Sequence, residues 1–293
     1  MQKIDVHIHA ALHRQERQPS ARNPADCYLA EAEELIGHLR AQGISRAVLL
    51  SSGEKGLDTG NAACCRMAQA HSGFLSWMCN IDTDTNPTEV ISRLSQLRDL
   101  GAVGIGELAV NEWMDSPLLT AVFAAAERLS LPVTIHMSPE PGYQYGVCDR
   151  PGLPLTEQVL RRFPKMILVG HSQMFWLEIS GDCPREGNDA RNRMGRGPVT
   201  AGGRLLELLE QHPNLYADLS AFSGSCAILR DEAFGLAFLE KYQDRLLFGT
   251  DTVNAQQRFP LGHFLDESAA NGRLSQRAYK KICCENAQRL YHL

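Results

Sequence analysis

The chain has 293 residues, of which 44% are hydrophobic and 22% charged, and its formal net charge is −5. This composition is ordinary for a folded globular protein and excludes a largely disordered chain. The negative balance gives no electrostatic attraction for nucleic acids or anionic membranes, so we expect neither as a partner. No apolar run approaches the about 18 residues of a membrane span, and Lys3 and Asp5 stand where a signal peptide needs apolar residues, which predicts a cytoplasmic protein.

Short runs rich in β-branched residues alternate with amphipathic stretches along the whole chain. The runs predict strands at residues 4–9, 46–51, 74–81, 103–108, 133–137, 167–171, 215–219 and 246–250. The amphipathic stretches predict helices at residues 26–42, 59–71, 87–100, 116–129, 156–163, 202–211, 231–242 and 275–291. Such strict alternation predicts parallel βαβ units, and eight units most simply close into an α/β fold, a (β/α)8 TIM barrel. We expect one domain over residues 1–293, with an open doubly wound sheet as the alternative.

The connections between these elements differ in length according to their direction. Long irregular stretches follow strands, at residues 10–25, 52–58, 138–152, 173–201 and 252–260, whereas the connections from helix to strand are short. In an α/β barrel this asymmetry places the elaborated loops at the carboxyl ends of the strands, where active sites of the fold lie.

The first predicted strand ends in the pair His7 and His9. Residues two apart in a strand point to one face, roughly 6–7 Å from each other. Two imidazoles that converge from one face can share a divalent ion. A lone pair of this kind is weak evidence, because histidines also serve as hydrogen-bonded polar residues. Its position at the carboxyl end of a barrel strand is what supports metal binding.

Four other predicted strands end in side chains of the same kinds. Glu107 ends the fourth strand, His136 the fifth and His171 the sixth, and Asp251 follows the eighth. Because the carboxyl ends of all barrel strands meet at one face, we expect these side chains to gather around His7. Nitrogen and oxygen donors without a thiolate suit a catalytic Zn²⁺, Mn²⁺, Fe²⁺ or Ni²⁺ rather than a closed structural zinc site.

The same segments resemble the amidohydrolase superfamily, and within it the amidohydrolase-related branch of decarboxylases and lactone hydrolases. The resemblance is carried by Ile4-Asp5-Val6-His7-Ile8-His9, Gly104-Ile105-Gly106-Glu107-Leu108, Leu131-Pro132-Val133-Thr134-Ile135-His136, Val169-Gly170-His171 and Leu247-Phe248-Gly249-Thr250-Asp251. It implies a metal-dependent enzyme in which His7, His9 and His136 bind metal, with Zn²⁺ as the first choice. Asp251 would be a ligand, a general base or both. His171 would bind a second metal or act as an acid, a base or an electrophile.

Glu107 stands at the position that separates branches of this superfamily. Some members carry a carboxylated lysine there, which this chain lacks, and others use a glutamate that bridges two metals. We expect Glu107 either to bind metal or to orient a histidine, and the number of ions, one or two, stays open. The resemblance also makes a homodimer the expected assembly.

The predicted reaction is hydrolysis of an amide, lactone or ester bond in a small organic molecule. A Zn²⁺-type ion lowers the pKa of bound water towards about 7. Asp251 could accept the proton and later deliver it, while the metal or His171 polarises the substrate carbonyl. The same site could instead decarboxylate an aromatic or related acid, and the ligand set does not separate these outcomes. A phosphodiesterase or nuclease is a weaker alternative, because the negative net charge does not favour binding of a phosphate backbone. The alternative that is not an enzyme is a metal-binding barrel without catalytic activity.

Substrate contacts are expected from two loops. The loop at residues 173–197 holds Trp176 and several arginines, and it is either a solvated excursion or a lid that grips an anionic substrate. Arg14 is expected to join it from the loop after the first strand. The other rim candidates are His13, Arg17, Arg22, Tyr143 and Tyr145. Asp218 and Asp5 are expected either to orient ligands or to play a structural role.

Overall fold

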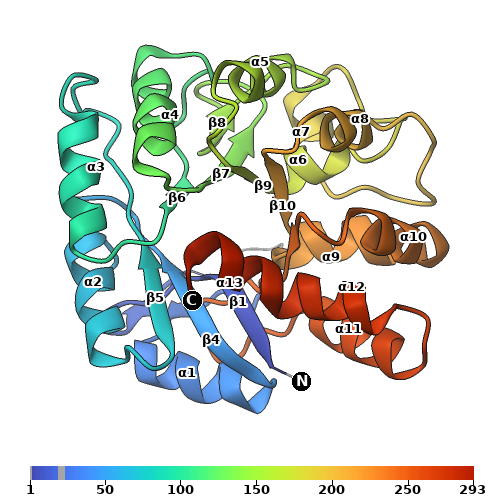
Figure 1. The fold of residues 1–293 in the computed structure, drawn as a ribbon, viewed down its shortest axis with the longest axis horizontal. Coiled ribbons are helices and arrows are strands. Elements are labelled where there is room, and N and C mark those ends of the chain that lie inside the picture. Colours follow the sequence, from blue (N-terminus) through green and yellow to red (C-terminus); the bar gives the residue numbers. More distant parts are fainter. Residues whose placement is uncertain (1, 19–23) are drawn as a thin grey trace.

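Eight parallel strands form the centre of the molecule (Figure 1) in a computed structural model that describes residues 2–18 and 24–293. They are β1 (Lys3–Ile8), β4 (Ile44–Leu50), β5 (Leu75–Met78), β6 (Ile105–Leu108), β7 (Val133–Ser138), β9 (Leu168–His171), β10 (Leu215–Asp218) and β11 (Leu246–Leu247). Each overlaps one of the eight runs predicted from the sequence. All strand pairs within this set are parallel, as βαβ units require.

The strands close into a ring at two seams. β1, β4 and β5 pair in that order, and β6, β7, β9, β10 and β11 form a second series. Between β5 and β6, the Cys79 amide donates to the Gly104 carbonyl at 2.9 Å. Between β1 and β11, the Val6 amide donates to the Phe248 carbonyl at 3.0 Å, and the amide of Asp251 donates to the carbonyl of His7 at 2.8 Å. The predicted barrel is therefore confirmed, and the open sheet is excluded.

Helices surround the ring, and all eight predicted helical regions contain one. They are α1 (Ala32–Ala41), α2 (Asn61–Ala70), α3 (Val90–Asp99), α4 (Pro117–Leu129), α5 (Pro154–Arg162), α8 (Arg204–Gln211), α10 (Glu232–Tyr242) and the final run of α12 (Gln276–Lys280), the π-helix η1 (Lys281–Glu285) and α13 (Asn286–Tyr291). The start predicted for α1 was wrong, because β3 (Tyr28–Leu29) pairs antiparallel with β2 (Gln15–Glu16).

Five further short elements lie in the connections. They are β8 (Val147–Cys148), α6 (Gln173–Leu177), α7 (Asn188–Arg191), α9 (Ala221–Leu229) and α11 (Leu261–Ala270). Most follow the carboxyl ends of strands, so they shape the face where the sequence places the site. Helix α9 follows the end of β10 after two residues.

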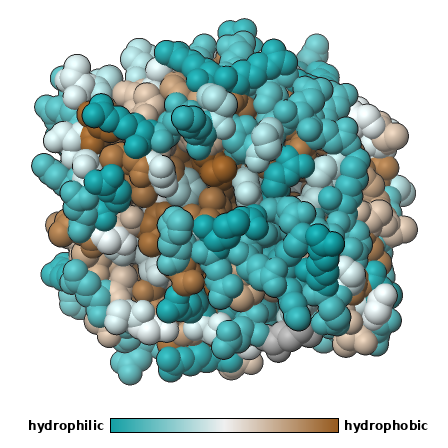
Figure 2. All heavy atoms as spheres, viewed as in Figure 1, coloured by the Kyte–Doolittle hydropathy of each residue, from teal (hydrophilic) through white to brown (hydrophobic). Residues whose placement is uncertain are grey.

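The amino-terminal end of the barrel is closed by the last helix of the chain. The side chain of Tyr291 in α13 is buried among Ile4, Val6 and Leu247 inside the ring, and α13 lies over this end in Figure 1. Figure 2 shows the same face covered mostly by hydrophilic side chains, with apolar ones gathered left of centre. Among the described residues no helix has the length and apolar character that a membrane crossing needs.

Candidate metal centre

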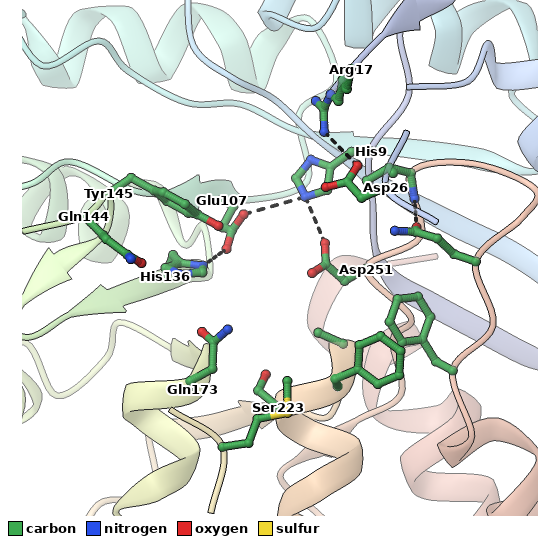
Figure 3. Close-up of a pocket in the computed structure, with 16 residues that line it drawn as sticks. His9, Arg17, Asp26, Glu107, His136, Gln144, Tyr145, Gln173, Ser223 and Asp251 are labelled. Carbon is green, nitrogen blue, oxygen red and sulfur yellow. Dashed lines mark hydrogen bonds and ion pairs between the residues drawn. The ribbon is translucent and has the colours of Figure 1, made fainter. Parts of the chain in front are cut away.

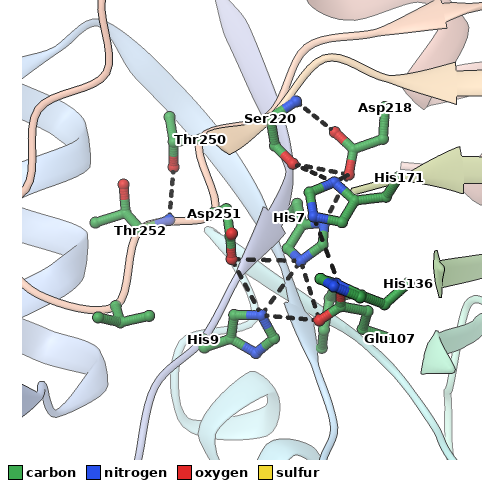
Figure 4. Close-up of polar contacts among 12 residues, drawn as sticks. His7, His9, Glu107, His136, His171, Asp218, Ser220, Thr250, Asp251 and Thr252 are labelled. Carbon is green, nitrogen blue, oxygen red and sulfur yellow. Dashed lines mark hydrogen bonds and ion pairs between the residues drawn. The ribbon is translucent and has the colours of Figure 1, made fainter. Parts of the chain in front are cut away.

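Six side chains converge at the carboxyl ends of the strands, as the sequence predicts (Figure 4). They are His7 from β1, His9 just after it, Glu107 from β6, His136 from β7, His171 from β9 and Asp251 after β11. In three overlapping groups of three, one donor atom from each residue lies within 4.8 Å of the other two. Elements far apart in the chain thus build one cluster of nitrogen and oxygen donors.

The first part of the cluster has the spacing of a tetrahedral ion site. The Nε2 atoms of His7 and His9 lie 3.2 Å apart, and Asp251 Oδ1 lies 3.5 Å from the first and 3.3 Å from the second. Ligands about 2.1 Å from a tetrahedral ion lie about 3.4 Å from each other. Neither Nε2 atom is used to hold the backbone, so both rings can turn these atoms to a common ion.

Glu107 stands between two pairs of histidines. Its Oε2 lies 3.7 Å from His7 Nε2 and 3.6 Å from His9 Nε2. Its Oε1 lies 2.6 Å from His136 Nδ1 and 3.7 Å from His171 Nε2. Each oxygen of the carboxylate therefore faces a different pair, and Oε1 is hydrogen-bonded to His136.

Asp218 lies beneath the cluster and contacts histidines of both pairs. Its Oδ2 is 2.6 Å from His7 Nδ1 and 3.3 Å from His171 Nδ1, and the side chain is fully buried. Ser220 Oγ donates to the same oxygen at 2.9 Å and lies 3.0 Å from His171 Nδ1. These contacts occupy the Nδ1 atoms and direct the Nε2 atoms of both rings towards the cluster, as carboxylates behind metal-binding histidines do.

Asp5 has a structural role instead. Its Oδ1 accepts from the amides of His7 and Thr250 at 3.1 and 2.9 Å, and its Oδ2 accepts from Thr250 Oγ1 at 2.6 Å. Burial raises the pKa of this carboxyl to about 7. The contacts tie the end of β1 to the segment before Asp251. Two residues that the sequence did not single out, Ser220 and Thr250, thus support the cluster, and their only signal is a position beside a strand end.

The carboxylates of the cluster are held in their charged form. Burial acts to raise the pKa of Glu107, but His136 and His7 beside it bring that pKa well below its ordinary value. Burial also opposes ionisation of Asp251, yet His7 and His9 lower its pKa. The same balance applies to Asp218, whose pKa is lowered by His7 and His171 against its burial. Charged carboxylates beside imidazoles form a donor set suited to a divalent cation.

A cavity of about 630 Å³ opens above the cluster (Figure 3). His9 and Asp251, with side chains 26% and 29% exposed, reach it together with Glu107 and His136, whereas His7 is fully buried. The rest of the lining is polar on one part and apolar on another, namely Arg17, Asp26, Gln144, Tyr145, Gln173, Ser223 and Gln257 against Met194, Ala221, Phe222, Val253 and Phe259. A volume of this size and a mixed lining suit a small organic molecule.

Comparison with known proteins agrees with this architecture. The family described as Amidohydrolase matches residues 4–293 of the chain. The chain belongs to this family. The resemblance stated from the strand ends is therefore confirmed, and the protein is an enzyme of a metal-dependent family. Among curated proteins, no relative matches.

Solved structures of similar fold include three whose chemistry is named. A 2,6-dihydroxybenzoate decarboxylase from Rhizobium has a TM-score of 0.63 at 16% identity, covering 100% of this chain and 99% of that one. An amidohydrolase from Burkholderia multivorans with bound Zn has a TM-score of 0.62 at 18% identity, covering 100% of both chains. A probable 2-pyrone-4,6-dicarboxylic acid hydrolase from Acinetobacter baumannii has a TM-score of 0.57 at 17% identity, covering 100% of both. At such identities the likeness concerns the fold.

Two substrate contacts expected of this amidohydrolase lie elsewhere. Trp176 is 2% exposed and does not line the cavity; its indole nitrogen donates to the carbonyl of Asp218 at 3.0 Å. Arg14 points away, because Nε donates to Glu16 at 2.8 Å and its guanidinium lies 3.7 Å from the centre of the Tyr28 ring. Trp176 therefore supports the residue behind the histidines, and Arg14 stiffens the loop after β1.

The remaining rim candidates divide between the cavity and its surroundings. Arg17 lines the cavity, where its Nη1 pairs with Asp26 at 3.4 Å, and Tyr145 lines it with a ring 4.4 Å from that of His136. His13 is 80% exposed and pairs with Asp58. Tyr143 contacts Asp189 outside the lining. Arg22 lies outside the described residues.

The loop at residues 173–197 is anchored rather than freely solvated. The guanidinium of Arg191 is buried and donates to the carbonyls of Asp149 at 2.8 Å and Pro139 at 3.3 Å. Asn192 donates to the side chain of Gln144 at 2.9 Å. These bonds join the loop to the segment after β7. Gln173 and Met194, at the two ends of the loop, consequently reach the cavity.

Proposed function

We propose that the protein is a hydrolase that uses two divalent ions to cleave an amide, lactone or ester bond of a small organic substrate. The observation that carries this proposal is the placement of Glu107, whose two carboxylate oxygens face different pairs of histidines. His7, His9, Asp251 and Glu107 would hold one ion. Glu107, His136 and His171 would hold the other, and Zn²⁺ is our first choice for both because nitrogen and carboxylate donors suit it.

When bound, such ions supply a Lewis acid for the substrate carbonyl and acidify water to near neutral pH. Asp251 is the residue placed to move protons. Its Oδ1 is turned to His7 and His9, which leaves Oδ2 to take a proton from the attacking water and pass it to the leaving group. His171 is 2% exposed and lies behind the cavity wall, so we assign it to metal binding rather than to proton transfer.

Hydrolysis fits a two-ion centre better than decarboxylation does. Two adjacent ions can stabilise both the attacking oxygen and the leaving group of a displacement, and loss of CO₂ has no such pair to stabilise. Structures of similar fold include both a probable 2-pyrone-4,6-dicarboxylic acid hydrolase and a 2,6-dihydroxybenzoate decarboxylase. Non-oxidative decarboxylation of an aromatic or related acid is therefore the alternative that the experiment must address.

The test combines metal counting with product analysis. Protein reconstituted with Zn²⁺ or Mn²⁺ is analysed for metal per chain, then incubated with matched panels of lactones, esters, amides and aromatic acids. We expect two ions per chain and formation of the carboxylate product, without CO₂, from a lactone, ester or amide. In Glu107→Gln we expect loss of at least one ion, whereas the matched control Glu112→Gln keeps both. One ion per chain with CO₂ release would establish the decarboxylase instead. A metal-loaded protein inert on every panel would overturn the enzyme assignment of this site.

A further inference from the structure

Arg230, the residue that ends α9, holds a charge that the rest of the described chain does not neutralise. Its Nη1 donates to the carbonyl of Arg196 at 3.4 Å. Its Nε and Nη2 are buried and have no hydrogen-bond partner, and none of the ion pairs among residues 2–18 and 24–293 includes this guanidinium. Two buried guanidinium nitrogens without partners are costly, so their retention points to a ligand that completes them.

The helix directs this arginine towards the site described above. Ala221, Phe222 and Ser223 at the start of α9 line the large cavity. Ser223, Ala227 and Arg230 follow at spacings of four and three residues, so they share one face of the helix. Seven residues advance a helix by about 10 Å. A long side chain in a helix leans towards the amino-terminal end, which here is the end at the cavity.

A small pocket lies between Arg230 and the large cavity. It is lined by Gln173, Trp176, Leu177, Met194, Gly195, Ser223, Ala227 and Arg230. Gln173, Met194 and Ser223 line the large cavity as well, so the two spaces share a wall. The small pocket measures about 10 Å³, about the space of one water. Met194 is unbranched and flexible, which makes it the side chain most able to move and join the two spaces.

Gly195 lies directly against the guanidinium. A Cβ at this position would lie 2.3 Å from Nη1 of Arg230 and 2.6 Å from its Cζ. Only glycine therefore allows the guanidinium to occupy this place beside the backbone. The position of the charge depends on the residue that follows Met194 in the loop.

We propose that Arg230 determines substrate specificity by binding a carboxylate at the end of the substrate remote from the scissile bond. The inference rests on the proposed function, because it takes the large cavity as the active site. Nε and Nη2 form one side of the planar guanidinium, and that side matches the two oxygens of a carboxylate. The apolar neighbours Leu177 and Ala227 strengthen the pairing by excluding water. Binding requires the side chain of Met194 to move aside.

The test uses straight-chain dicarboxylates of increasing length to measure the distance between the metal centre and Arg230. Zinc-loaded protein is titrated calorimetrically with the series from succinate to azelate, and with the monocarboxylates of equal chain length. One carboxylate is expected at the metal centre and the other at Arg230, so one length should bind about 10- to 100-fold more tightly than its monocarboxylate. Arg230→Met should abolish this advantage without changing monocarboxylate affinity. Arg230→Lys should keep part of it, and the exposed control Arg193→Met should keep all of it.

A second variant distinguishes loss of the carboxylate contact from a general loss of stability. Gly195→Ala retains the charge but displaces the guanidinium, so it should also reduce the dicarboxylate advantage, with an unchanged melting temperature and metal content. Equal binding of every dicarboxylate by wild type and Arg230→Met would overturn the inference, as would the absence of an advantage at any length. Metal content and monocarboxylate affinity are measured on the same samples. If the wild type neither holds metal nor binds monocarboxylates, the proposed function fails. If the wild type does both but shows no preference for a dicarboxylate, only the role of Arg230 fails.

Discussion

The cluster has two halves that differ in charge and in support, with Glu107 between them. We call His7, His9 and Asp251 the first half, and His136 and His171 the second half. The first half contains a carboxylate of its own, and it is built where β11 and β1 adjoin. The second half contains imidazoles alone, placed side by side in the register of β7 and β9. An ion in the first half therefore meets more ligands and more negative charge.

The supports behind the two halves also differ. His7 Nδ1 has a carboxylate oxygen of Asp218 at 2.6 Å, whereas that oxygen is 3.3 Å from His171 Nδ1. The His136 Nδ1 atom contacts Glu107 at 2.6 Å. His136 is thus oriented by the shared ligand itself. We expect the first half to hold its ion more tightly, and the second half to be the part that loses its ion first.

The largest effect is expected from removal of the first half. His7→Ala combined with His9→Ala takes away two of the four ligands of the first ion, so that ion should be lost. The first ion also helps to fix Glu107, so the metal content should fall to near zero and activity by at least about 10³-fold. Elemental analysis and acid release measure both. His13→Ala, on an exposed ring outside the cavity, is the control and should change neither. Unchanged metal in the double variant would disprove the centre.

A variant of the second half should separate the two ions. His136→Ala leaves all four ligands of the first half in place, so we expect one ion per chain instead of none. Activity should fall by about 10²-fold, the scale of one lost electrostatic stabiliser, and excess Zn²⁺ should not restore it. His212→Ala is the matched control, because that imidazole lies near Glu157, away from the centre. If His136→Ala retained two ions, or lost both, the division of the cluster at Glu107 would be wrong.

Asp218→Asn addresses the support that both halves share. The substitution keeps the shape of the side chain but removes the charge behind His7 and His171. Loss of such a residue typically weakens metal affinity by 10- to 100-fold, and here we expect about this loss for both ions. Competition with a fluorescent chelator would measure each affinity. An effect confined to one ion would show that Asp218 orients a single histidine.

The sequence alone predicted the barrel and the convergence of the six candidate donors, because both depend on regular features. Strand ends such as Glu107 and His136 come to one face whenever parallel strands close into a ring, whatever the loops do. The contact from Asp218 to His7 was not predictable, since it depends on how closely β10 and β1 approach across the ring. The position of Trp176 outside the large cavity was not predictable for a related reason: its segment folds back so that the indole contacts the Asp218 carbonyl.

The sequence did not indicate Arg230 as a site residue, because it did not predict the helix that Arg230 ends. The segment Ala221–Leu229 contains one glycine and two serines, which are poorer helix formers than alanine, and it has no polar face to mark a helical period. Packing against α6 and α10 makes it helical nevertheless, and this brings Arg230 into line with Ser223. Loop and short-helix positions depend on such tertiary contacts, so substrate-binding residues are harder to predict than metal ligands.

The smallest effect, and the sharpest test of the comparison, is expected from Ser220→Ala. Ser220 Oγ lies 3.0 Å from His171 Nδ1 and donates to Asp218 at 2.9 Å, but no hydrogen bond joins it to His7 among the described residues. Loss of one such hydrogen bond costs about 1 kcal/mol, or about 5-fold in affinity, and this loss should fall on the second ion alone. The control Ser225→Ala removes a hydroxyl that donates to the Ala221 carbonyl and should alter neither affinity. Equal weakening of both ions would mean that Ser220 acts by holding Asp218, which contacts histidines of both halves, rather than through its own contact with His171.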